Sequence, residues 1–108
     1  MFEEKINGRC PVETTVKLLS GKYKSTILWY LRDGALRYGD LHSRIPQASQ
    51  KMLSEQLGEL VEDKLISKIV YLVVPPKTEY SLTRFGLALI PLIQEMTDFG
   101  REYLEENT

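Results

Sequence analysis

The sequence contains one cysteine, Cys10, and one histidine, His42, so few residue combinations can support metal or nucleophilic chemistry. A structural zinc site needs four ligands, and no second cysteine or histidine stands at ligand spacing. Asp40 lies two residues before His42 in a segment expected to be helical, and residues two apart on a helix do not face each other. No glycine-rich phosphate loop occurs. The sequence therefore predicts no catalytic residues, no metal site and no organic cofactor.

Cys10 stands between Arg9 and Pro11, at the expected start of a helix. A helix N-terminus and a neighbouring cation both favour the thiolate, which is the reactive form of cysteine. Glu13 opposes this effect because it adds a negative charge one turn away. Cys10 is therefore a redox-sensing candidate, which can form an intersubunit or mixed disulfide or be alkylated by a quinone or aldehyde. The alternative is an unreactive cysteine that belongs only to the fold.

Charge is distributed unevenly along the chain, although the net charge is only −1. Residues 14–54 contain seven lysines and arginines against two aspartates, and residues 94–108 contain five acids against one arginine. Nucleic-acid binding requires a local basic patch and not a global excess. The first half of the chain can therefore supply such a patch, and the acidic end would be held away from DNA.

The length of 108 residues allows one small domain with one hydrophobic core. We expect a single domain over residues 1–108, with flexible ends at about 1–9 and 105–108. Hydrophobic residues make up 43% and charged residues 27%, which is ordinary for a globular protein. The longest apolar run, 69–76, is far shorter than the roughly 20 residues of a membrane helix, and the N-terminus lacks a secretory signal pattern. We expect a cytoplasmic protein with no membrane partner.

Periodicity and capping residues predict a mainly helical fold with a small β-hairpin. Pro11 suits the first position of a helix that ends at Ser20-Gly21, and Ser49 suits the N-cap of a helix that buries Leu53, Leu57, Leu60 and Val61. The other predicted helices cover 22–32, 40–45 and 84–104, the last capped by Thr83 and kinked or broken at Pro91. Predicted strands cover 66–74 and 78–82, with a small strand at 37–38. Three helices followed by a hairpin make a winged helix-turn-helix.

Several spaced motifs are similar to those of a known family. They are Cys10-Pro11-Val12-Glu13, Gly21-Lys22-Tyr23-Lys24, Arg37-Tyr38-Gly39-Asp40-Leu41, Ser49-Gln50-Lys51-Met52-Leu53, Gln56-Leu57, Glu59-Leu60, Asp63-Lys64-Leu65-Ile66 and the run 71–83. Together they resemble the HxlR family of MarR-like winged-helix transcriptional regulators of bacteria, over Cys10 to about Gly100. The resemblance implies a homodimeric DNA-binding protein that dimerises through its first and last helices and often responds to oxidants through an N-terminal cysteine. Two departures are Tyr23, where the family often has Trp, and Gly58, where many members carry a longer polar residue.

The N-terminal end of the fourth helix carries the residues expected to read DNA. Gln pairs with adenine, Lys with guanine and Ser with either in the major groove, which makes candidates of Ser49, Gln50, Lys51 and Ser54. Phosphate contacts fix orientation without reading sequence, and for these we expect Lys22, Lys24 and Arg37. Lys77 at the hairpin tip is expected beside the backbone or minor groove. The alternative for each is an ordinary solvated side chain.

The last helix is unusually apolar for the end of so small a domain. Dimerisation would bury this surface together with the first helix, and the expected dimer residues are Val12, Val16, Ile93, Met96, Phe99 and Tyr103. The alternative is that the stripe covers its own core. We therefore expect a homodimeric regulator on a pseudo-palindromic duplex, responsive to an oxidant or small-molecule effector. A winged-helix protein–protein module without DNA binding is the second hypothesis, and salt dependence separates the two.

Overall fold

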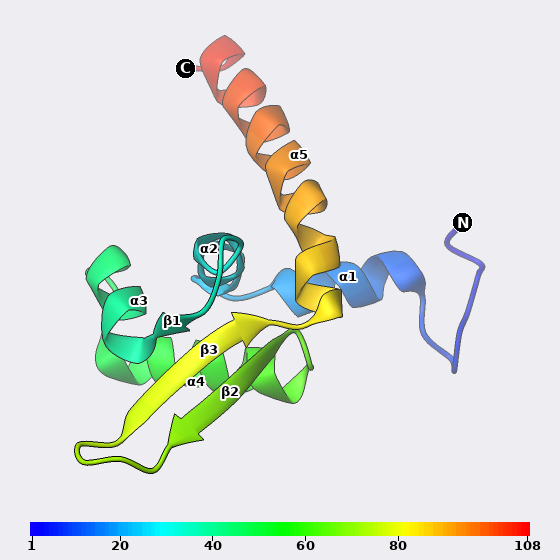
Figure 1. Cartoon of the computed structure of the whole chain (residues 1–108). Coiled ribbons are helices and arrows are strands. Elements are labelled where there is room, and N and C mark those ends of the chain that lie inside the picture. Colours follow the sequence, from blue (N-terminus) through cyan, green and yellow to red (C-terminus); the bar gives the residue numbers. More distant parts are fainter.

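A bundle of helices packed on a small sheet forms the body of the protein, as the computed structural model of residues 1–108 shows (Figure 1). The element bounds, in chain order, are α1 Pro11–Leu19, α2 Lys24–Tyr30, β1 Leu36–Arg37, α3 Tyr38–Arg44, α4 Gln50–Glu62, β2 Ile66–Tyr71, β3 Lys77–Leu82 and α5 Arg84–Glu106. This order of helices and strands is that of a winged helix-turn-helix, so the predicted fold is confirmed.

The core lies between α2, α3, α4 and the sheet. Its fully buried side chains come mostly from α2 and α4, and they are Ile27, Leu28, Leu31, Leu41, Ile45, Leu53, Leu57, Leu60 and Ile66. Leu53, Leu57 and Leu60 recur at helical spacing, so α4 buries one stripe and leaves the opposite face to solvent. The core thereby fixes which face of α4 is exposed.

The sheet is antiparallel with the order β1-β3-β2. Tyr80 in the central strand is paired with Leu36 on one side and Lys68 on the other. The hairpin ends at the pair Tyr71 and Lys77, so β2 stops three residues short of the predicted Val74. Pro75 and Pro76 have no N–H to donate, and the ladder cannot continue through them.

Local signals set some helix bounds well and others poorly. Ser49 caps α4 by accepting from the Met52 N–H at 3.0 Å, as predicted. Thr83 caps α5 by accepting from the Gly86 N–H, and its hydroxyl donates to the Lys64 carbonyl at 2.6 Å. The α2 helix is shorter than predicted because its last turn tightens into bonds between residues three apart, such as Arg32 N–H to the Trp29 carbonyl.

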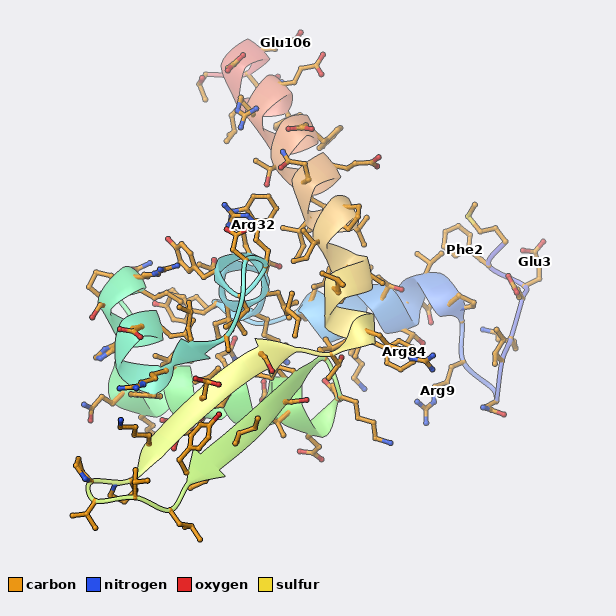
Figure 2. The ribbon with its side chains drawn as sticks, in the orientation of Figure 1. Phe2, Glu3, Arg9, Arg32, Arg84 and Glu106 are labelled. Carbon is orange, nitrogen blue, oxygen red and sulfur yellow. The ribbon has the colours of Figure 1, made fainter.

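The two outer helices contribute little to the core. No residue of α1 is buried, and only Gly86 and Ile93 are buried in α5. The α5 helix continues through Pro91, so of the predicted kink or break the break does not occur, and the helix includes residues 105 and 106 of the expected flexible end. Figure 2 shows Glu106 at its far tip, away from the rest of the chain. The radius of gyration is 15.7 Å, whereas a compact chain of this length has about 13 Å.

Candidate nucleic-acid interface

The first turn and a half of α4 presents a polar, solvent-exposed surface. The structure brings together the four predicted reading residues, Ser49, Gln50, Lys51 and Ser54, all of them exposed. The segment 49–54 contains no acidic residue, and Lys51 makes no ion pair. An exposed helix N-terminus with an unpaired cation attracts phosphate and can place side chains in a major groove.

Tyr38 and His42 support this end of α4 from α3, a role that sequence reasoning missed. The Tyr38 hydroxyl donates to the Gln50 carbonyl at 3.3 Å and lies 3.5 Å from the Ser54 hydroxyl. Nε2 of His42 lies 3.0 Å from the Ala48 carbonyl in the turn between the helices. Tyr38 and His42 are four residues apart on one helix, so they share a face. That spacing is the sequence signal that could have found them.

The cations expected to meet phosphate differ in accessibility. Lys22 is exposed, with its ammonium 5.5 Å from the centre of the Tyr23 ring, and Arg37 is exposed in β1. Neither makes an ion pair. Lys24 is only 6% exposed, and its ammonium lies 2.9 Å from Glu59 Oε2. Because a phosphate contact requires an accessible ammonium, the prediction for Lys24 is corrected.

The wing tip carries both the predicted cation and an apolar loop. Lys77 opens β3, is exposed and makes no ion pair. Before it, Leu72 is 94% exposed in the loop between β2 and β3. Sequence reasoning treated the 66–74 segment as strand and so did not expect these apolar side chains to point into water. The wing therefore offers a single cation on an otherwise apolar tip.

Cys10 occupies the N-cap position of α1, where the sequence placed it. Its carbonyl accepts from the Thr14 N–H at 2.9 Å, and its side chain makes no capping hydrogen bond. The residue is 3% exposed, which the sequence did not indicate. Large reagents can reach the thiol only when the neighbouring segment opens.

The surface expected to dimerise is mostly open. Val12 and Val16 of α1 and Met96, Phe99 and Tyr103 of α5 are exposed. Val12, Val16, Leu92 and Met96 help to line a groove of about 550 Å³ between the two helices. Ile93 is different, because it is 6% exposed and belongs to the core cluster. The prediction that Ile93 lies in the dimer surface is therefore corrected.

No helix of the structure has the length and apolar content needed to cross a bilayer. The structure has three main surface features. They are the polar face of α4, the unpaired cations around it and the open apolar face on α1 and α5.

Known proteins resemble this chain in sequence and in structure. Residues 18–108 match the family described as HxlR-like helix-turn-helix. YdeP, an HTH-type transcriptional regulator of Bacillus subtilis, is 47% identical over 94 residues, which cover 87% of this chain and 73% of YdeP.

Two solved regulators share the fold. The redox regulator HypR in its oxidised form has a TM-score of 0.79 at 40% identity, covering 86% of this chain and 96% of that chain. The reduced form of YodB from Bacillus subtilis has a TM-score of 0.79 at 34% identity, covering 91% of this chain and 97% of that chain. YodB is also known in diamide-treated and quinone-bound structures.

Proposed function

The chain belongs to the HxlR-like helix-turn-helix family and is a DNA-binding transcriptional regulator, and we propose that it reads duplex DNA as a homodimer through α4. The observation that carries this proposal is the exposed, acid-free N-terminal end of α4. Ser49, Gln50, Lys51 and Ser54 would face the bases of a major groove. The protein would act by binding and not by catalysis, in the cytoplasm.

Phosphate contacts would come from the exposed cations around α4. Lys22 and Arg37 have accessible charges without acidic partners. Lys77 would lie beside the DNA backbone or in the minor groove next to the groove that α4 occupies. Each contacted phosphate releases condensed counterions, so binding would weaken as salt rises.

The homodimer would form through α1 and α5. An exposed apolar face that includes Val16, Met96, Phe99 and Tyr103 supports this arrangement, because monomeric proteins rarely leave such a face open. A two-fold dimer presents two copies of α4 to successive major grooves, which requires a pseudo-palindromic site. Each half-site would be bound by one protomer, whose single domain covers residues 1–108.

Cys10 is the proposed sensor of an oxidant or electrophile. Support comes from the redox regulator HypR and from YodB in its diamide-treated and quinone-bound forms. Two Cys10 thiols from two protomers would lose two protons and two electrons to an oxidant such as diamide and form one disulfide, whereas a quinone would add to the sulfur. Burial of Cys10 implies that the segment before α1 opens before either reaction.

The test of DNA reading is fluorescence anisotropy with two duplexes, the intergenic DNA that flanks the protein's own gene and an unrelated control. We expect tight, salt-sensitive binding that prefers the protein's own flank. Lys51→Met should weaken that binding about tenfold. Lys64→Met, which removes a cation beyond the opposite end of α4, should not. Equal, weak binding to both duplexes would favour a protein-docking module.

A further inference from the structure

Lys24 is a buried cation in an unfavourable position. It is the first residue of α2, where the helix macrodipole places partial positive charge, and its side chain is almost fully buried. A buried charge requires a close partner, and here the partner is the carboxylate of Glu59 in α4, 2.9 Å away. Glu59 itself is half-exposed. The contact therefore joins the start of one helix to the flank of another.

Gln56 completes this contact from the preceding turn of α4. Its Nε2 donates to Glu59 Oε2 at 3.4 Å, and its Oε1 accepts from the Tyr23 N–H at 3.2 Å. Tyr23 is the N-cap residue of α2 and has no side-chain cap of its own. Gln56 thus satisfies that N–H in the role that a capping-box glutamine plays within a single helix.

Gly21 leaves the space that the contact occupies. A Cβ at this position would lie 2.5 Å from Oε1 of Gln56 and 2.9 Å from Cδ of Lys24. Any larger residue would push against both side chains. The residues Lys24, Gln56 and Glu59 are called the α2–α4 clamp below.

We propose that the α2–α4 clamp positions α4 for DNA reading by fixing its rotation and axial register on the body. The other buried side chains of α4 are leucines, and apolar packing is not directional, whereas hydrogen bonds constrain both distance and angle. The hydrogen bonds of Tyr38 join α4 to α3 only, so the clamp is what fixes α4 against α2. A helix has a radius of about 5–6 Å with its side chains, so a 20° rotation of α4, taken for illustration, would move a reading group by about 2 Å. Such a shift exceeds the tolerance of a base-edge hydrogen bond.

This inference rests on the proposed use of α4 in DNA reading. It predicts that loss of the clamp and loss of a phosphate contact have different effects on DNA binding. Loss of the clamp should lower the preference for the correct sequence about tenfold, the effect of one lost base contact. The salt dependence should stay unchanged because no phosphate contact is removed. A purely structural pair would instead change thermal stability and leave sequence preference alone.

The experiment uses a duplex that the wild-type protein selects from a random library and a scrambled duplex of the same composition. Affinities for both are measured against salt, at a temperature where thermal unfolding shows each variant to be folded. Lys24→Met and Glu59→Gln should reduce the preference about tenfold at constant salt slope. Gly21→Ala should also reduce the preference about tenfold, although it keeps every charge. If Lys24→Met does not fold, Gly21→Ala and Glu59→Gln together test the proposal.

Lys22→Met is the matched control, since it removes an exposed lysine two residues away. It should weaken binding to both duplexes equally. The slope of the logarithm of the binding constant against the logarithm of the salt concentration should become shallower by about 0.9. If Lys24→Met behaves in that way, Lys24 is a phosphate contact and the proposal is overturned. Unchanged preference and slope in the folded clamp variants would also overturn it. A wild-type protein that selects no sequence would instead refute the proposed function, and the clamp proposal with it.

Discussion

Truncation of Phe99 to alanine should weaken the proposed dimer strongly. Phe99 is 71% exposed on α5 and stacks on Tyr103, with ring centroids 6.2 Å apart. A phenylalanine presents about 200 Å², so about 140 Å² of it would be in water in the monomer. Complete burial would contribute about 3.5 kcal/mol per protomer at about 25 cal/mol per Å².

A symmetric dimer buries two copies of Phe99, and the truncated area is only part of each side chain. Half of the summed burial, about 3.5 kcal/mol, corresponds to a rise of about 300-fold in the dimer dissociation constant. The monomer should be as stable as before, because the side chain is exposed in it.

Sedimentation equilibrium of wild type and Phe99→Ala, without DNA, measures this constant. Leu72→Ala is the control, since Leu72 is more exposed but lies in the wing. Its dissociation constant should match that of wild type. If Phe99→Ala dimerises as tightly as wild type, or if Leu72→Ala dissociates, the assignment of the α1 and α5 face is refuted.

Five further substitutions concern other parts of the molecule. Ser49→Ala should lower the free energy of unfolding by about 1 kcal/mol in thermal melts, because α4 loses its cap. Gly86→Ala should destabilise by about 2 kcal/mol or more, because its Cβ would overlap the Leu65 carbonyl, whereas Gly100→Ala in open space should stabilise the same helix. Diamide should abolish DNA binding of wild type but not of Cys10→Ser, and the native thiol should react with a bulky disulfide reagent far more slowly than the urea-unfolded chain. Burial, with a smaller effect from Tyr38, raises the pKa of Tyr80 above its ordinary value of 10.0. The resulting stability is complete below about pH 10 and is lost as pH rises through the folded pKa, so Tyr80→Phe should remove that alkaline loss in urea titrations.

Local sequence signals account for the elements that were predicted well. Ser49 and Thr83 each carry a hydroxyl that satisfies an N–H in the first turn of the following helix, and Pro11 suits a first helical position. Such contacts span three residues or fewer, so the chain encodes them locally. The exposed face of α4 followed from the spacing of its leucines.

Contacts between distant parts of the chain account for the errors. Lys24 looked like a free cation because its partner, Glu59, is in another helix. The apolar stripe of α5 indicated that these side chains are buried, but not which surface covers them. The sequence therefore could not distinguish Ile93, which packs into the core, from Phe99, which faces solvent. The burial of Cys10 likewise depends on tertiary packing.

The proposed function requires that two copies of α4 occupy successive major grooves of one site. Hydroxyl-radical footprinting of the wild-type protein on the duplex it selects detects this arrangement. We expect two protected half-sites related by two-fold symmetry, with centres about 10 base pairs apart or a multiple of that spacing. A single protected segment, or protection without symmetry, would show that the protein does not bind in this way.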